Sequence, residues 1–129
     1  MKRLILLTLI LATITVACKY KSFHYYKVTN GCSSAIQVVY QTAESNSTEQ
    51  TLSLEIEETA TIYSDDVGID KVSKYKQDGE NLTSFEKMEA TKNDTLKSKT
   101  DFLKTSAWGY EEKGKRKAEY TLVITDADF

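Results

Sequence analysis

The sequence contains no proline, one histidine and two cysteines in 129 residues. A single histidine, His24, argues against catalytic and metal centres that need several imidazole groups. Two cysteines are too few for a small secreted domain that is held together by several disulfides. Without proline, turns must rely on asparagine, aspartate and only five glycines. None of these shortages prevents folding, because a chain of this length can bury one hydrophobic core.

The chain also lacks the short motifs of several enzyme classes. It has no glycine-rich phosphate loop, no Cys or His spacing of a metal centre and no Gly-x-Ser-x-Gly turn. Its formal net charge of −2 excludes a generally basic nucleic-acid-binding protein. We therefore expect no cofactor, no metal, no nucleic-acid partner and no enzymatic activity.

The first 17 residues are typical of a secretory signal peptide. Lys2 and Arg3 precede an uncharged, mainly apolar run of 14 residues, Leu4 to Ala17. A membrane-spanning helix needs roughly 20 apolar residues, so this run is too short to remain as one. We predict that residues 1–17 are removed, which leaves 112 residues with 15 basic and 19 acidic side chains, a net charge of −4.

The end of this segment, Thr15 to Cys18, resembles the lipobox of bacterial lipoproteins. Ala17 and Cys18 match the most restricted positions of that motif, whereas Thr15 replaces its usual leucine. The resemblance implies that Cys18 is acylated and becomes the mature N-terminus, so membrane lipid is a partner. It also implies an outer-membrane position, because Lys19 replaces the aspartate that retains lipoproteins at the inner membrane. The domain is expected to face the periplasm, because the acidic tract that resembles a surface-export signal of Bacteroidota is absent after Cys18. The alternative is ordinary cleavage after Ala17, which leaves Cys18 unmodified.

The state of the second cysteine depends on that choice. With Cys18 acylated, residues 18–22 form a lipid-anchored tether, and the four residues after the cysteine span at most about 14 Å. Cys32 is then alone in an oxidising compartment, either buried or reactive. Without acylation, the two cysteines are candidates for a disulfide.

Residues 23–129 alternate apolar and polar side chains with the period of two that is typical of half-buried strands. The alternation predicts an N-terminal hairpin of residues 23–29 and 36–41, strands at 52–56 and 59–63, and a C-terminal hairpin of residues 108–110 and 118–125. About seven short strands predict one all-β domain, an antiparallel, immunoglobulin-like β-sandwich, with a small β-barrel as the alternative. The expected core consists of Ile36, Val38, Leu52, Leu54, Ile56, Ile62, Trp108, Tyr120, Leu122 and Ile124.

The middle of the domain is ambiguous. Residues 72–76 are predicted as a strand that ends in a turn. Residues 82–92 fit a helix, because Thr83 and Glu86 have the spacing of a capping box, or a strand, which we favour. Residues 91–105 are polar and lysine-rich, which predicts a long loop.

Charged side chains are distributed unevenly. Residues 28–70 contain eight acidic and no basic side chains, whereas residues 71–117 contain twelve basic and eight acidic ones. The acidic region is either part of a mixed, solvated surface or a patch for a cationic protein. That patch would contain Glu55, Glu57, Glu58, Asp65, Asp66 and Asp70. Aspartates here and at Asp126 and Asp128 also offer oxygens to calcium, but the order of an EF-hand loop is missing.

Three further features concern the surface. Residues 113–117 predict a basic hairpin tip, which suits anionic headgroups or glycans or simply keeps the turn soluble. Phe23 and Tyr25 share the outward phase of the first strand. Their rings are candidates for stacking on sugars or peptides, and the alternative is that they pack at the rim of the sheet. Asp94-Thr95-Leu96 resembles the O-glycosylation motif of envelope proteins from Bacteroidota, which implies Thr95 as the acceptor.

These observations favour a lipid-anchored protein of the bacterial cell envelope with a non-enzymatic binding or structural role. Its expected partner is a cationic protein or an envelope glycan. One alternative is an inhibitor of a cationic envelope hydrolase such as lysozyme, although the Ser-Gly-x-x-Tyr motif of such inhibitors is absent. A second alternative is a hydrolase that depends on paired carboxylates.

Overall fold

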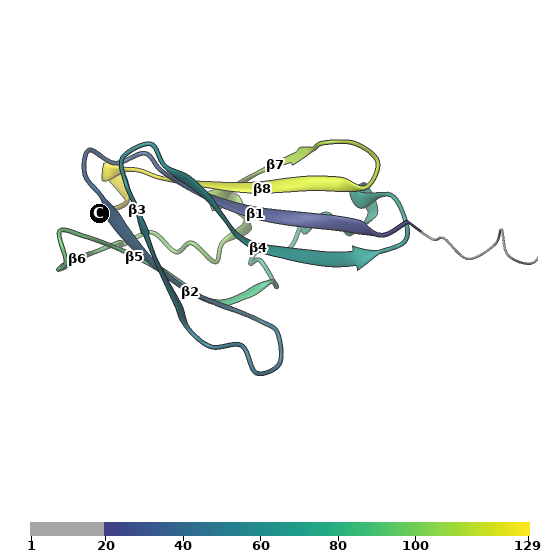
Figure 1. Cartoon of the computed structure of the whole chain (residues 1–129), viewed down its shortest axis with the longest axis horizontal. Helices are drawn as coiled ribbons and strands as arrows, with labels where there is room; N and C mark the ends of the chain where they lie inside the picture. The colour runs from purple at the N-terminus through teal and green to yellow at the C-terminus, as the bar shows by residue number, and fades with distance from the viewer. Residues whose placement is uncertain (1–19) are drawn as a thin grey trace, which may run out of the picture.

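The computed structural model describes residues 20–129, which form a β-sandwich of two four-stranded sheets (Figure 1). The strands are β1 (Ser22–Asn30), β2 (Ile36–Thr42), β3 (Gln50–Leu54), β4 (Thr59–Gly68), β5 (Phe85–Lys92), β6 (Leu96–Lys97), β7 (Trp108–Glu112) and β8 (Lys117–Ile124). Three short 3-10 helices accompany them: η1 (Val72–Tyr75), η2 (Thr105–Ala107) and η3 (Asp126–Asp128). The predicted all-β sandwich is confirmed, with eight strands and no closed barrel. The prediction of purely antiparallel sheets is wrong, because β1 and β8 pair in parallel. The predicted signal peptide and Cys18 lie outside the described residues.

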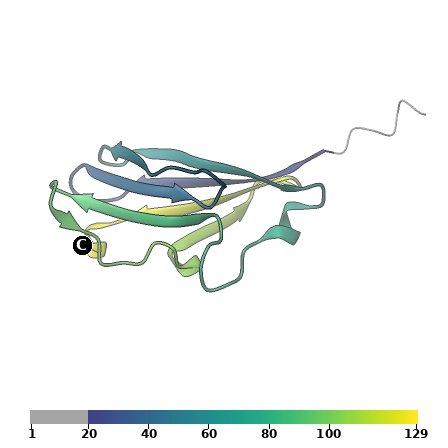
Figure 2. The same cartoon turned by 90° about the horizontal axis from the view of Figure 1, so that it is seen from below.

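The chain passes repeatedly between the two layers (Figure 2). One sheet has the order β4-β1-β8-β7 and the other β3-β2-β5-β6. The predicted N-terminal hairpin is therefore wrong, because β1 and β2 belong to different sheets. The five residues between them reach up to about 17 Å, enough to cross the roughly 10 Å between packed sheets. The C-terminal hairpin is confirmed, since β7 and β8 pair antiparallel.

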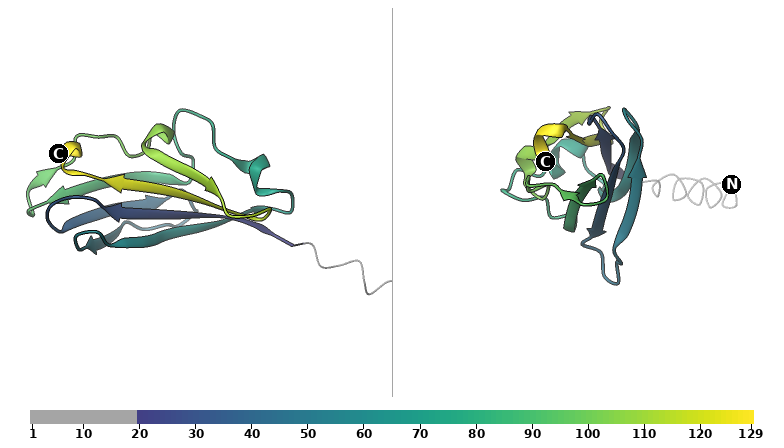
Figure 3. Two further views of the ribbon diagram at one scale, coloured as in Figure 1. Left: turned by 90° about the horizontal axis from the view of Figure 1, so that it is seen from above. Right: turned by 90° about the vertical axis from the view of Figure 1, so that its left-hand side faces the viewer.

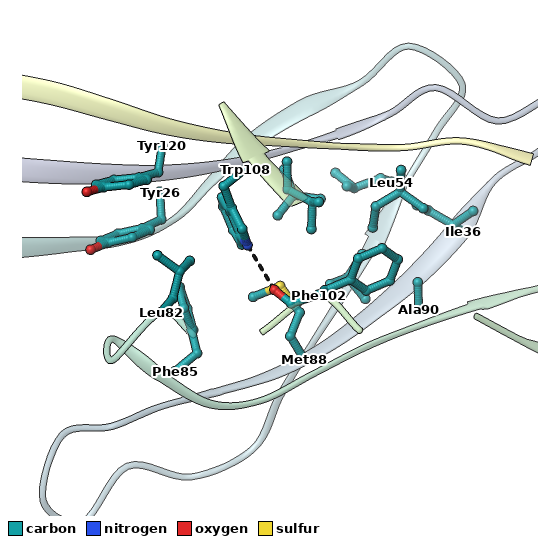
Figure 4. Packing of buried hydrophobic residues seen from close by; sticks show 14 of the residues in the cluster. Tyr26, Ile36, Leu54, Leu82, Phe85, Met88, Ala90, Phe102, Trp108 and Tyr120 are labelled. Carbon is teal, nitrogen blue, oxygen red and sulfur yellow. Dashed lines mark hydrogen bonds between the residues drawn. The ribbon is translucent and has the colours of Figure 1, made fainter. Parts of the chain in front are cut away.

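Aromatic side chains fill the centre between the sheets. β1 buries every second residue, from Ser22 to Asn30. Tyr26 stacks on Tyr120, with ring centroids 5.1 Å apart. The indole N–H of Trp108 donates a 2.8 Å hydrogen bond to the Phe102 carbonyl (Figure 4), so this buried donor is satisfied.

Seven of the ten predicted core residues are buried: Ile36, Val38, Leu54, Trp108, Tyr120, Leu122 and Ile124. Leu52 and Ile62 are partly buried against that cluster. Ile56 is the wrong prediction, because its side chain is 55% exposed. β3 ends at Leu54, and Glu57 has a left-handed φ of 64°, so a turn interrupts the alternation at Ile56.

The ambiguous middle resolves into three elements. β5 occupies residues 85–92, so the strand alternative is confirmed. The strand predicted at 72–76 is wrong, because residues 72–75 form η1, in which only Val72 is buried. The predicted long loop carries the two-residue strand β6 and the first residue of η2, Thr105. No helix among residues 20–129 has the length and apolar character to cross a membrane.

Candidate functional site

A cavity of about 480 Å³ opens to solvent at the end of the sandwich where β1 begins. β1 supplies His24 to its wall, the β2–β3 loop supplies Glu44, and β4 supplies Tyr63 and Asp65. The segment from η1 to the start of β5 closes the other side. Because Glu44, Asp65 and Asp66 line this cavity, we call it the acidic pocket.

A β-bulge in β4 directs the acidic side chain inward. The register of β4 against β1 shifts at Ile62, which has no partner. Beyond the shift, Tyr63 lies opposite Tyr26, and Asp65 lies opposite His24. Directly paired residues of antiparallel strands point to the same face, so Tyr63 and Asp65 face the interior. Uninterrupted alternation would have turned both side chains outward.

His24 forms the buried wall of the acidic pocket. Its side chain is 1% exposed, and neither ring nitrogen has a hydrogen-bond partner. Its ring contacts those of Tyr26, Tyr110 and Tyr120 edge-on, the closest centroid being 5.2 Å away. Burial lowers the pKa of His24, and a backbone contact with Val72, whose geometry does not meet that of a hydrogen bond, only partly opposes this. A neutral imidazole has one donor and one acceptor, and orphaned buried groups of this kind are rare.

The carboxylates of the acidic pocket differ in their partners. Burial, followed by the negative charges of Glu44 and Asp66, raises the pKa of Asp65. The hydroxyl of Tyr63 donates a 2.8 Å hydrogen bond to Glu44. Lys21 pairs with Asp66 at 2.6 Å and lowers the pKa of that carboxyl. Among the described residues, Glu44 and Asp65 have no ion-pair partner, so they supply the pocket's uncompensated charge.

Gln77 connects the outer wall of the acidic pocket to the core through hydrogen bonds. Its side-chain amide donates 2.8 Å hydrogen bonds to the hydroxyl groups of Tyr26 and Ser84. Its carbonyl oxygen accepts a 2.7 Å bond from the backbone N–H of Thr83. Its own backbone N–H donates to the hydroxyl of Tyr120 at 2.7 Å. The wall is therefore built before any ligand arrives, which lowers the ordering cost of binding.

A second cavity, of about 410 Å³, lies at the opposite end of the sandwich. Ser34, Gln37, Glu55 and Asp94 are among its lining residues. It contains neither an aromatic side chain nor a buried ionisable one. The acidic pocket is therefore the better candidate for a ligand site.

The six acidic residues predicted as one patch form two groups. Glu55, Glu57 and Glu58 lie in the turn between β3 and β4, whereas Asp65, Asp66 and Asp70 lie at or beyond the far half of β4. The strand between Glu58 and Asp65 spans about 23 Å. Of the six, only Asp65 and Asp66 line the acidic pocket, together with Glu44 and His24, which the sequence did not mark as ligand residues.

The predicted calcium candidates at the C-terminus make structural contacts. Asp126 pairs with Lys92 at 2.6 Å, and Asp128 accepts a 2.8 Å hydrogen bond from the backbone of Thr125. Within residues 20–129, no three His, Cys, Asp or Glu side chains lie close enough together to hold a metal ion. Thr95 is exposed between β5 and β6, as a glycosylation acceptor must be.

The remaining candidates occupy well-defined positions. The thiol of Cys32 is buried and donates to the Ile124 carbonyl at 3.6 Å, and burial raises its pKa, so it is a poor nucleophile. The rings of Phe23 and Tyr25 lie 6.4 Å apart on the outer face of β1. The ammonium of Lys117 lies 4.8 Å from the Tyr25 ring centroid, so that ring is already partly covered.

Comparison with protein-family models, curated proteins and solved structures finds no match for this chain. The chemistry of the acidic pocket therefore carries the functional argument. Uncompensated carboxylates and tyrosine rings attract organic cations, and an imidazole nitrogen accepts an N–H bond. The arrangement suits an alkylammonium or guanidinium group.

Proposed function

We propose that this chain is a lipid-anchored protein of the bacterial cell envelope, whose β-sandwich is a non-enzymatic binding module for a cationic partner. The observation that supports the binding role is the acidic pocket, where Glu44 and Asp65 lie beside the uncharged, unpartnered His24. A lysine or arginine side chain of an envelope protein would place several N–H donors among these acceptors.

The proposed location rests on the sequence of the N-terminus. Export and acylation are supported by Lys2, Arg3 and the lipobox-like Ala17-Cys18. Lys19 favours the outer membrane, and the lack of an acidic tract after Cys18 favours the periplasmic side. The acidic pocket lies at the end of the domain where β1 begins, so the partner would bind near the membrane.

The inhibitor alternative uses the same observation. A cationic hydrolase such as lysozyme carries basic side chains on its surface, and one inserted into the acidic pocket would pair with Glu44 and Asp65. This candidate differs from the leading one in the consequence of binding, since only inhibition would lower the activity of the partner.

Calorimetric titration with trilysine tests the binding role. We expect saturable binding by the wild type, and loss of at least tenfold in affinity with Glu44→Gln and Asp65→Asn together, since charged hydrogen bonds contribute about 1.5–3 kcal/mol each. Glu57→Gln with Glu86→Gln removes the same charge from exposed positions outside the acidic pocket and should change affinity little.

Two results would count against this proposal. Equal weakening by both pairs of substitutions would mean that trilysine responds only to net charge. Hydrolysis of an envelope glycan that disappears with Asp65→Asn would favour the carboxylate-dependent hydrolase instead.

Intact-mass measurement of the membrane-extracted protein tests the anchor. We expect a mass above that of residues 18–129 by the mass of the acyl groups, and loss of acylation in Cys18→Ser, because a hydroxyl is a poorer nucleophile than a thiolate. An unmodified Cys18, or a disulfide between Cys18 and Cys32, would contradict anchoring.

The immunoglobulin-like strand arrangement stays a prediction. Two packed sheets and a C-terminal hairpin fit it. The position of β1 between β4 and β8 departs from the order of strands in immunoglobulin domains.

A further inference from the structure

Three basic segments meet at the end of the sandwich where β1 begins (Figure 3). The backbone N–H of Val72, in η1, donates a 2.8 Å hydrogen bond to the carbonyl of Lys115, in the β7–β8 turn. The guanidinium of Arg116, in the same turn, donates to the carbonyls of Tyr20 and Ile69. These bonds fix η1, the β7–β8 turn and the residues before β1 against one another.

The fixed segments carry a surplus of positive charge. Residues 20–22, 69–78 and 111–119 contain eight basic and five acidic side chains, although the predicted mature chain has a net charge of −4. Glu44, Asp65 and Asp66 of the acidic pocket lie at the same end but outside these segments. We call their basic side chains the basic cap: Lys21, Lys71, Lys74, Lys76, Lys113, Lys115, Arg116 and Lys117. Half of them pair with carboxylates, namely Lys21, Lys74, Lys113 and Lys117. The other four have no ion-pair partner among the described residues.

Apolar side chains are exposed beside the same charges. Tyr20 is 74% exposed and Ile69 is 47% exposed, and Arg116 bonds the backbone of both. A tyrosine with an apolar ring and a polar hydroxyl is typical of the boundary between water and lipid headgroups. Charge and exposed apolar groups therefore coincide at one end of the molecule.

We propose that the basic cap docks on the anionic headgroups of the membrane and holds the sandwich in one orientation. The proposal rests on the proposed acylation of Cys18, which lies two residues before Tyr20 and therefore within about 7 Å of it. The Debye length at physiological ionic strength is about 8 Å, so the cap's charges would lie within reach of headgroup phosphates. Two or more acyl chains suffice for stable attachment, so the cap would set the orientation of the sandwich and not its attachment.

Lysine modification in reconstituted vesicles tests the docking. The membrane-extracted protein is placed in vesicles of phosphatidylcholine, with or without phosphatidylglycerol, and treated with an amine-reactive reagent. Mass spectrometry should show slower modification of Lys71 and Lys115 in the anionic vesicles, and recovery of the rate in high salt. Lys97 and Lys99, exposed at the opposite end, serve as internal controls and should react equally in both. Equal modification of Lys71 and Lys115 in both vesicles would overturn the proposal.

A second measurement tests docking by the basic cap separately from acylation of Cys18. If the mass shows that Cys18 carries no lipid, the anchor is contradicted, and the isolated chain can be cosedimented with the same vesicles. Binding to the anionic vesicles should then weaken on the order of 30-fold in Lys71→Gln with Lys115→Gln. Lys97→Gln with Lys99→Gln removes the same charge at the other end and should leave binding unchanged. Equal binding to neutral and anionic vesicles would again overturn docking by the cap.

Discussion

Two buried polar residues of β1, His24 and Asn30, face the same side of the same strand and differ completely in their partners. Asn30 is fully buried, and its side chain makes four hydrogen bonds of 2.9–3.1 Å, to the carbonyls of Ser34, Leu54 and Glu55 and from the N–H of Cys32. His24 is 1% exposed, and both ring nitrogens lack a partner.

The difference separates a structural residue from a candidate binding residue. Asn30 joins the β1–β2 connection to the end of β3, so its hydrogen bonds are part of the fold. His24 makes no such hydrogen bonds, yet it occupies a costly buried position in the wall of the acidic pocket. Under the proposed binding role, a bound cation would provide the hydrogen-bond partner that His24 lacks within the fold.

Asn30→Ala should have the largest effect on stability. It removes the side-chain partner of the buried Leu54 carbonyl and of the buried Cys32 N–H. Each buried group that loses its partner costs about 1–3 kcal/mol, so we expect a loss of about 2 kcal/mol or more. Urea denaturation measures it, with the exposed Asn81→Ala as a control that should change stability by less than about 0.5 kcal/mol. A loss below about 1 kcal/mol would show that Asn30 does not hold the turn.

His24→Phe should act in the opposite direction. Phenylalanine keeps the edge-on contacts with the surrounding tyrosines and removes two orphaned nitrogens, so stability should be equal or higher by about 1 kcal/mol. Trilysine affinity should fall in the same variant. A marked loss of stability, as in Asn30→Ala, would mean that His24 is structural.

The pH dependence of unfolding provides a finer comparison within the acidic pocket. The pKa of folded His24 lies below its ordinary 6.5, so as pH falls below 6.5 the unfolded chain takes up more protons and stability decreases. The pKa of folded Asp65 lies above its ordinary 3.8, so in the window above 3.8 this group stabilises the fold as pH falls. In His24→Phe, the contribution that lowers the urea midpoint below pH 6.5 should disappear. In Asp65→Asn, the contribution that raises the midpoint as pH falls toward 3.8 should disappear. If the pH dependence of the urea midpoint is the same in both variants as in the wild type, the lowered pKa of His24 and the raised pKa of Asp65 are contradicted.

The smallest effect is expected from the basic cap. Lys71 and Lys115 are exposed and make no ion pair in the described structure, so Lys71→Gln with Lys115→Gln should alter stability by less than about 0.5 kcal/mol. Measured beside the vesicle experiments, this variant shows whether its loss of membrane binding comes from charge alone. A loss of stability comparable to that of Asn30→Ala would attribute the binding defect to unfolding.

The sequence predicted β1 well because a period of two is a local property of the strand. The outward phase of Phe23 and Tyr25 is confirmed, whereas Tyr26 and Val28, which the expected core did not include, are fully buried. The pairing of β1 was not predictable in this way, since a short polar connection suits a hairpin as well as a crossing between sheets.

The acidic pocket was not predicted because it also depends on how strands pair, which alternation along one strand does not show. Alternation starting at Ala60 and Ile62 cannot reveal a bulge, which appears only when β4 pairs with β1. The bulge alone turns Asp65 toward His24. Likewise, Gln77 lies in a segment without periodicity, and its role depends on hydroxyl groups that are distant in sequence.

The most direct test uses the only histidine of the chain as a reporter. Selective ¹⁵N labelling gives the side-chain signals of His24 alone, so its protonation and its ligand contacts are read without overlap. We predict a neutral imidazole with a titration midpoint below 6.5, and a change in a ring-nitrogen shift on addition of trilysine that Asp65→Asn abolishes. An imidazole that titrates at its ordinary pKa and does not respond to trilysine would contradict the acidic pocket as a binding site.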